Sequence, residues 1–265
     1  MRIFGRLAVA LAFFATSSLA QDGRLMRLST GQDSRGWEAV GRLDIEGKGF
    51  CTASLIREDL VLTAAHCVYD RTGEPVAADR FTFNAGLREG RAEAYRNVRR
   101  VVVHPGYVYH SGDTATEVAR DLALLQLELP IRTTRIRPYA VASDAMQNEE
   151  IGVVSYARGR EEAPSLQDVC RVVGSQEDIL IMSCEVNFGA SGSPVFRIAS
   201  DGAKIVSVVS AMSELKGNAV SLGTSLGRPL QELLAAFDGT TVDSARPRVI
   251  TPGERNDTGA KFIRP

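Results

Sequence analysis

The sequence predicts an all-β protein built from two closed or sandwiched sheets, with one helix near the C-terminal end. Short runs rich in β-branched and aromatic residues recur along the chain with turn residues between them, and a helical repeat is almost absent. The composition, 44% hydrophobic and 24% charged, is that of a globular protein. It excludes the collagen-like, coiled-coil and disordered classes.

Twelve strands are predicted, six on each side of a connector at residues 130–139. Because so many open strand edges would invite aggregation, the strands are expected to close into barrels or pack as a sandwich. The first six are residues 40–44, 50–56, 60–63, 81–85, 96–103 and 122–127. The other six are residues 151–156, 169–173, 179–183, 194–197, 205–211 and 219–224.

The predicted helix follows the last strand. Pro229 suits the first turn of a helix, and Gly239 is expected to end it. Four apolar residues spaced i, i+3, i+4 and i+7 would share one face: Leu230, Leu233, Leu234 and Phe237. Residues 239–265 contain few large apolar side chains and are expected to form a flexible tail.

The N-terminus has the features of a secretory leader at residues 1–20. Arg2 and Arg6 precede an apolar run at residues 7–15, and small residues lead to a cleavage site after Ala20. No later run has the roughly 18 apolar residues of a membrane span, and no Cys follows the cleavage site to carry a lipid. The mature chain is therefore expected to be secreted or periplasmic, without a membrane anchor.

Export favours pairing of the four cysteines, which permit three connectivities. The sequence alone does not separate the three, but spacing suggests Cys51 with Cys67 and Cys170 with Cys184.

Charge and motif spacing argue against several partners. The chain has 31 basic and 32 acidic residues, and loss of two basic residues with the leader gives a net charge of −3, which does not favour nucleic-acid binding. His66, His104 and His110 are the only histidines and lack a zinc spacing, and no Gly-rich phosphate loop is present. We expect no metal and no cofactor, and a monomer.

Two segments carry a histidine and an aspartate at strand ends. His66 ends the run Val61-Leu62-Thr63-Ala64-Ala65-His66-Cys67, where a fixed imidazole would suit general-base chemistry. Asp121 opens an apolar strand, where pairing with a His ring N–H would offset the cost of burying its charge. The alternatives are a structural His66, and an Asp121 that is solvated or paired with Arg120. Asp113, in a polar loop, is a rival partner for the histidine.

A third segment, Asn187-Phe188-Gly189-Ala190-Ser191-Gly192-Ser193-Pro194, is a Gly-rich turn before a strand. Such a turn can present Ser191 Oγ while the N–H groups of Gly189 and Ser191 form an oxyanion hole. A plain turn between strands is the alternative.

Taken together, the three segments resemble the signatures of the trypsin/chymotrypsin-like serine peptidases, in the order His, Asp, Ser. The segment His104-Pro105-Gly106-Tyr107 also resembles the family, and the resemblance covers about residues 37–237. It implies an enzyme of two six-stranded antiparallel β-barrels, at about residues 37–130 and 140–238, that acts on protein or peptide substrates. Ser191 would be the nucleophile, His66 the general base and then acid, and Asp121 its orienting partner. The bridge between Cys51 and Cys67 would match the family's disulfide beside the histidine.

Two departures concern activation. Most family members have an Asp immediately before the nucleophile, where it binds the new N-terminal amine formed by zymogen cleavage, but this chain has Ala190. Residues 21–36 also lack the usual Ile-Val-Gly-Gly start. The resemblance to bacterial glutamyl-endopeptidase-like branches, which share Gly-x-Ser-Gly-Ser-Pro, implies that leader removal alone is sufficient. The alternative is a short propeptide that is cut near Arg24, Arg27 or Arg35.

Specificity rests on three further positions. Glu185 stands six residues before Ser191, where a carboxylate at the bottom of the primary pocket would favour Lys or Arg substrates. Asn187 replaces the family's usual Cys nearby, so the loop path differs, and Glu185 facing solvent is the alternative. The resemblance places Ser210 on the strand that pairs with substrate and Met212 at the pocket wall.

The alternatives to a serine endopeptidase are a catalytically silent binding protein of this fold and a latent zymogen. A hydrolase of another fold is disfavoured, because its nucleophile turn would lead into a helix.

Overall fold

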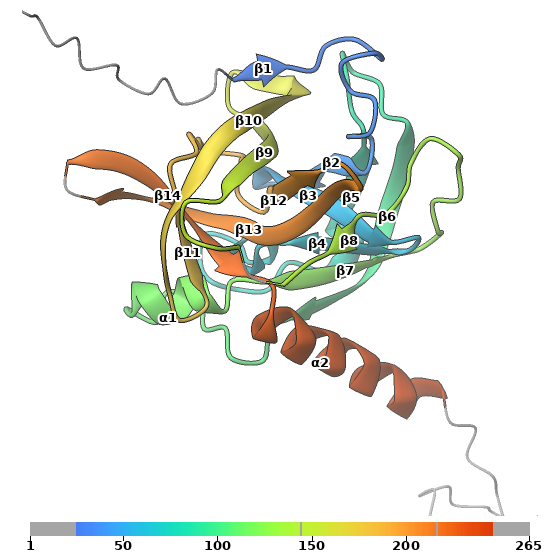
Figure 1. Cartoon of the computed structure of the whole chain (residues 1–265). Coiled ribbons are helices and arrows are strands. Elements are labelled where there is room, and N and C mark those ends of the chain that lie inside the picture. The colour runs from blue at the N-terminus through green and yellow to red at the C-terminus, as the bar shows by residue number, and fades with distance from the viewer. Residues whose placement is uncertain (1–24, 144, 216, 246–265) are drawn as a thin grey trace, which may run out of the picture.

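The computed structural model describes residues 25–143, 145–215 and 217–245. The predicted leader and residues 246–265 of the predicted tail lie outside these ranges. The fold belongs to the predicted all-β class, and it has two α-helices where the sequence predicts one (Figure 1).

The first sheet is a closed six-stranded barrel made of the strands predicted for the first half of the chain. They pair in the order β2-β3-β4-β7-β6-β5, and β2 closes the barrel by pairing with both β3 and β5. Leu43, Leu55, Leu62 and Phe83 are fully buried in these strands. The strands are β2 (Val40–Ile45), β3 (Gly49–Arg57), β4 (Leu60–Thr63), β5 (Phe81–Ala85), β6 (Ala94–Val103) and β7 (Ala123–Leu127).

The second sheet contains the other six predicted strands and two short additions. Because β9 pairs with both β10 and β12, the pairings β9-β10-β11-β14-β13-β12 form a ring. The six strands are β9 (Glu150–Ala157), β10 (Arg160–Gln176), β11 (Ile179–Met182), β12 (Pro194–Ala199), β13 (Gly202–Leu215) and β14 (Asn218–Ser225). The predicted all-β fold of two sheets is confirmed, but the second sheet has eight strands and not six, because β1 and β8 add to it.

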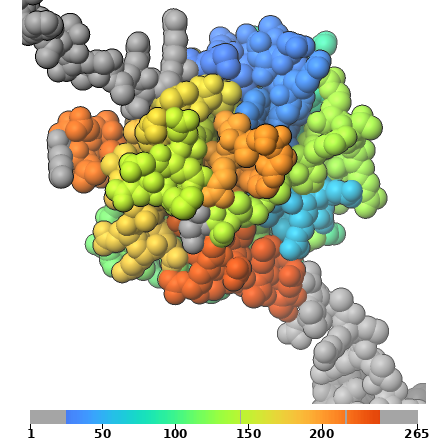
Figure 2. Space-filling model, in the orientation of Figure 1, coloured from blue at the N-terminus to red at the C-terminus, as the bar shows by residue number. Residues whose placement is uncertain are grey.

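Three short elements escaped prediction because they are too short to show a repeat. Strands β1 (Met26–Arg27) and β8 (Ala140–Val141) pair with β10 and β13. Figure 2 shows the N-terminal part of the described chain lying against the surface of β10. Helix α1 (Thr114–Ala119) has six residues and is capped by Asp113, whose side chain accepts the N–H groups of Ala115 and Thr116.

Helix α2 (Arg228–Ala245) packs against β6, β7 and β14 through its buried Leu230, Leu233 and Phe237 (Figure 1). The predicted end at Gly239 is wrong, because the helix continues to Ala245. A glycine inside a helix costs only about 1 kcal/mol relative to alanine, which is too little to end it. Neither described helix has the length and apolar character of a membrane span.

An aromatic cluster joins the two sheets. The ring of Phe196 on β12 lies 5.0 Å from that of Trp37 and 4.7 Å from that of Tyr139, between centroids. Tyr156 of β9 is fully buried in the same core, and its hydroxyl donates to the carbonyl of Leu87. The core of the first barrel therefore continues across the interface, and this shared core fixes the position of one sheet relative to the other.

Both suggested disulfides are formed, Cys51 to Cys67 and Cys170 to Cys184. They close loops of similar length, with sequence separations of 16 and 14 residues. We expect each double Cys→Ala variant to lose about 3 kcal/mol of unfolding free energy, because the unfolded chain regains loop entropy. Urea melts of the two variants beside wild type measure this, and an unchanged midpoint for either would contradict it.

His104 connects the end of β6 to α2. The imidazole is buried, its Nδ1 accepts the N–H of Gly106 at 3.0 Å, and its Nε2 lies 3.1 Å from Glu232 Oε2. Burial and the charge of Arg120 lower the pKa of His104, against the opposing charges of Glu232 and Asp178. The folded protein therefore keeps this imidazole neutral at a pH where the unfolded chain protonates it.

The expected result is a loss of stability as the pH falls below about 6.5, the ordinary pKa of histidine. Below that value the unfolded state binds more protons at His104 than the folded state, so the unfolding free energy decreases with decreasing pH until the lowered folded-state pKa is reached. Melting temperatures between pH 8 and 5 test this. His104→Gln should flatten the slope and His110→Gln, at an exposed position, should not; equal slopes in both variants would contradict it.

Candidate active site

The three predicted segments line two neighbouring hollows where the two barrels face each other. His66 and Asp121 line one hollow of about 230 Å³, and Ser191 lines a neighbouring hollow of about 170 Å³. The two hollows share Ser210 and Ala211 of β13. The first barrel thus supplies the histidine and the aspartate, and the second barrel supplies the serine.

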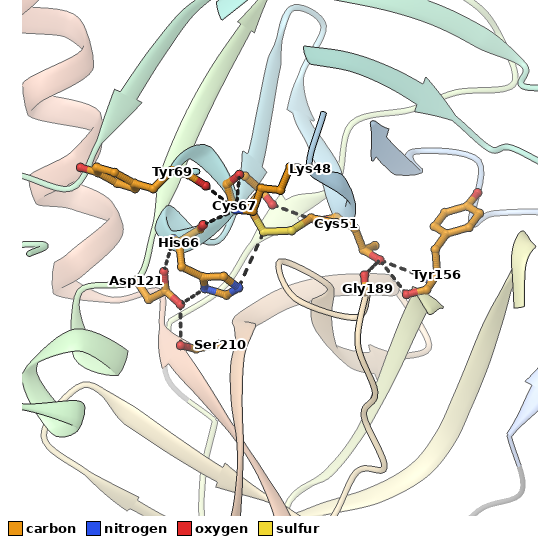
Figure 3. The surroundings of a disulfide bond; sticks show 11 residues. Lys48, Cys51, His66, Cys67, Tyr69, Asp121, Tyr156, Gly189 and Ser210 are labelled. Atoms are coloured by element: carbon orange, nitrogen blue, oxygen red, sulfur yellow. Dashed lines mark hydrogen bonds and ion pairs between the residues drawn. A yellow bond between two sulfur atoms is a disulfide. The ribbon is translucent and has the colours of Figure 1, made fainter. Parts of the chain in front are cut away.

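His66 and Asp121 form a close pair (Figure 3). The Nδ1 of His66 is 2.7 Å from Asp121 Oδ2, and the backbone N–H of His66 donates to Asp121 Oδ1 at 2.8 Å. The hydroxyl of Ser210 donates to Oδ2 at 2.5 Å. Because a carboxylate only accepts, Nδ1 carries a proton, and in a neutral imidazole Nε2 is then the nitrogen with the lone pair. Asp113, the rival partner, caps α1 instead.

Asp121 is 2% exposed. Burial raises the pKa of its carboxyl, but the charge and hydrogen bonds of His66 and the hydrogen bond from Ser210 outweigh this, so the pKa lies below its usual value. The carboxylate therefore stays ionised at neutral pH, and it fixes the orientation of the imidazole.

The turn that carries His66 is the 3-10 helix η1 (Ala65–Val68), in which Ala65 and Cys67 are buried. The disulfide from Cys67 to Cys51 ties this turn to β3, and Cys67 Sγ lies 3.9 Å from His66 Nε2 (Figure 3). Both sulfurs are used in the disulfide, so this group of Cys51, His66 and Cys67 is not a metal site. A side chain 29% exposed leaves His66 accessible to a substrate.

Lys48 is a supporting residue that sequence reasoning missed. Its ammonium donates to three carbonyls of this turn, those of His66 at 2.9 Å, Cys67 at 3.2 Å and Tyr69 at 2.5 Å (Figure 3). Burial lowers the pKa of Lys48, although Asp70 and Asp121 oppose this. Carbonyls at the end of a helical turn lack helical partners, and Lys48 supplies a partner for these three. A lysine between two glycines gives no sequence signal of this role.

The turn around Ser191 contains two glycines with positive φ, +95° at Gly189 and +79° at Gly192. The N–H groups of Ala190 and Ser193 donate within the turn, to Asn187 O at 2.9 Å and Ala190 O at 3.0 Å. The N–H groups of Gly189 and Ser191, in contrast, have no acceptor in the described part of the chain. These are the two donors that the sequence assigns to an oxyanion hole.

The predicted specificity residues line two hollows. Met212 and Ser210 line the hollow beside Ser191, together with Val186, Asn187, Phe188, Val209 and Ala211. Glu185 is exposed and lines a separate hollow of about 240 Å³ that shares Val186 and Met212. Ser210 has a contact that the sequence did not indicate, because its hydroxyl is held by Asp121.

Comparisons with known proteins extend these observations. The chain is 24% identical over 139 residues to coagulation factor IX of Cavia porcellus, covering 51% of this chain and 46% of the relative. It is 37% identical over 108 residues to the modular serine protease of Drosophila melanogaster, covering 38% and 17%. Identity to Limulus clotting factor C of Carcinoscorpius rotundicauda is 32% over 107 residues, covering 38% and 10%. The chain thus spans less than half the length of these relatives.

A solved structure entitled "Structure of Glu endopeptidase in complex with MPD" has the same fold, with a TM-score of 0.68 and 17% identity, over 83% of this chain and 98% of that one. The model of the trypsin family matches residues 30–221. This range includes His66, Asp121 and Ser191 and most of both barrels. The chain belongs to the trypsin family.

Proposed function

We propose that the protein is a secreted or periplasmic serine endopeptidase, with Ser191 as nucleophile, His66 as general base and acid, and Asp121 as the residue that orients His66. The observation that carries this is the buried Asp121 carboxylate, which holds His66 Nδ1–H at 2.7 Å and so leaves Nε2 free to take a proton. Family membership and the three relatives with protease or clotting-factor names support a proteolytic activity.

The reaction would proceed in two halves. Ser191 Oγ attacks the carbonyl carbon of the scissile peptide and its proton passes to His66 Nε2. The oxyanion accepts hydrogen bonds from the N–H groups of Gly189 and Ser191, and collapse of the intermediate expels the amine, which takes the proton from His66. Water then attacks the acyl-enzyme by the same route and frees the acid. Loss of one oxyanion donor in such sites costs about 10²- to 10³-fold in kcat.

Labelling with a fluorophosphonate probe tests this proposal. Wild type should label, and Ser191→Ala and His66→Ala should not. Ser193→Ala is the matched control: Ser193 lies two residues away, and its buried Oγ has no hydrogen-bond partner in the described chain, so labelling should persist. Folded wild type that fails to label would favour a silent binding protein or a latent zymogen.

We further infer that removal of the leader is sufficient for activity. Arg27 pairs with Glu89 at 2.8 Å, Leu28 is fully buried, and its N–H donates to Pro164 O at 2.8 Å. A cut after Arg27 or Arg35 would detach residues that belong to this packing, and buried Ala190 has no carboxylate to bind a new amine. N-terminal sequencing of active protein should find Gln21, and a start after Arg24, Arg27 or Arg35 would support a propeptide instead.

A further inference from the structure

The hydroxyl of Thr52 connects both barrels directly under the Ser191 turn. Thr52 is a fully buried residue of β3. Its Oγ1 accepts the N–H of Tyr156 from β9 at 3.0 Å, and its one hydroxyl proton faces two carbonyls, that of Gly189 at 3.0 Å and, farther away, that of Tyr156 at 3.2 Å. We propose that Thr52 is a positioning residue that holds Gly189 and Ser191 in the conformation that binds the oxyanion. This inference rests on the proposed function.

The direction of the Gly189 N–H follows from the carbonyl of Phe188, which belongs to the same peptide group. The carbonyl of Phe188 accepts the N–H of Arg158 at 2.7 Å. In a planar trans peptide the N–H points opposite to the carbonyl, so the Gly189 N–H points away from Arg158. On the other side of Gly189, the carbonyl is held by Thr52 Oγ1. Both peptide groups that flank this glycine are therefore fixed, although glycine itself restricts neither.

Thr52 also contacts Ser191, the residue that supplies the second donor. Its backbone N–H donates to the carbonyl of Ser191 at 2.9 Å, and its own carbonyl accepts the hydroxyl of Thr63 at 2.9 Å. One residue of the first barrel thus contacts the turn at Gly189 and at Ser191, the two residues whose N–H groups remain free. A substitution of Thr52 can remove the hydrogen bond from its hydroxyl to Gly189 and leave the backbone hydrogen bond to Ser191 in place.

The hydroxyl has no substitute in its surroundings. Apart from the bond from Thr52, the carbonyl of Gly189 has no hydrogen-bond donor in the described chain. Figure 3 shows Gly189 and Tyr156 converging on one side of the disulfide, with dashed lines between the sticks there. Without the hydroxyl, the Tyr156 N–H and the Gly189 carbonyl would both lose a partner. The Gly189–Ala190 peptide would then lose a bond that restrains its rotation.

Thr52→Val removes the hydroxyl and keeps the shape of the side chain, whereas Thr52→Ser keeps the hydroxyl. The measurement is the rate of fluorophosphonate labelling against probe concentration, which separates the limiting rate from the half-saturating concentration. We expect Thr52→Val to lower the limiting rate about 10- to 100-fold, a fraction of the effect of losing a donor outright, with a half-saturating concentration within about twofold of wild type. Thr52→Ser should recover the limiting rate to within about threefold.

Ser207→Ala is the control for loss of a buried hydroxyl. Ser207 is also fully buried and donates to a strand carbonyl, that of Thr224, at 2.8 Å. The Ser207→Ala variant should have a lower melting temperature than wild type and the same limiting labelling rate. If Thr52→Val does not fold, Thr52→Ala, which adds no atoms, takes its place. Failure of both to fold while Ser207→Ala folds would make Thr52 a purely structural residue and overturn the proposal.

Two other results would also overturn it. One is a limiting rate for folded Thr52→Val within twofold of wild type. The other is a Thr52→Ser variant as slow as Thr52→Val, because then packing and not the hydroxyl matters. These results are distinct from failure of the proposed function, in which folded wild type itself does not label.

Discussion

Asp121→Asn is expected to lower kcat about 10⁴-fold and to leave the fold intact. Three donors converge on this carboxylate: the ring N–H and backbone N–H of His66, and the hydroxyl of Ser210. An asparagine has one acceptor oxygen, so its amide NH₂ must face one of these donors. The ring of His66 then loses its tautomer or its orientation, and Nε2 no longer accepts the proton of Ser191.

Steady-state kinetics on a general protein substrate and fluorophosphonate labelling measure this loss. Asp113→Asn is the control, because Asp113 caps α1 and asparagine caps a helix equally well. Activity that fell with Asp113→Asn and not with Asp121→Asn would show that the wrong aspartate had been assigned.

The pairing of Asp121 with His66 should also make the free energy of unfolding depend on pH. The folded-state pKa of Asp121 is lowered, so its contribution to stability is complete above the unfolded value of about 3.9 and is lost as the pH falls through the folded value. The stability difference between wild type and Asp121→Asn should therefore shrink below about pH 4.

Gly192→Ala is the second change with a large expected effect, a loss of about 3 kcal/mol or more of unfolding free energy together with loss of labelling. A Cβ on Gly192 would lie 2.1 Å from Thr63 Oγ1 and 2.3 Å from the carbonyl oxygen of Thr52. Its φ of +79° adds backbone strain. Relief of the clash would displace the Ser191 turn from β3 and β4.

Gly90→Ala separates strain from clash. Gly90 has a similar φ of +76°, and nothing lies within 4 Å of an added Cβ. It should cost only about 1 to 2 kcal/mol and leave labelling unchanged. Denaturant melts of the two variants supply the comparison, and equal losses would show that the close packing of Gly192 does not matter.

Local patterns were sufficient to locate the twelve longer strands, because alternation and turn residues are properties of neighbours in sequence. The bounds were less exact: β10 runs from Arg160 to Gln176, whereas residues 169–173 were predicted. Local patterns failed where a partner is distant in sequence. Lys48, 18 residues from His66 in sequence, and Thr52, 137 residues from Gly189, carry no local mark of their contacts. The role of Ser210 beside Asp121 was missed for the same reason. Helix α1 and strands β1 and β8 are too short for any period to appear.

The first and last described elements, β1 and α2, each pack on a barrel that the nearer half of the chain does not form. The first described strand, β1, belongs to the second barrel, and the last helix, α2, packs back onto β6 and β7 of the first. Arg100 of β6 donates to the carbonyl of Phe237 at 2.7 Å, and its guanidinium lies over that ring. Neither barrel is thus a continuous, self-sufficient stretch of chain. Each half expressed alone would lack the element that the other half contributes, β1 or α2. The two barrels should therefore melt in one cooperative transition. A proteolytic cut in the connector should leave the two fragments associated.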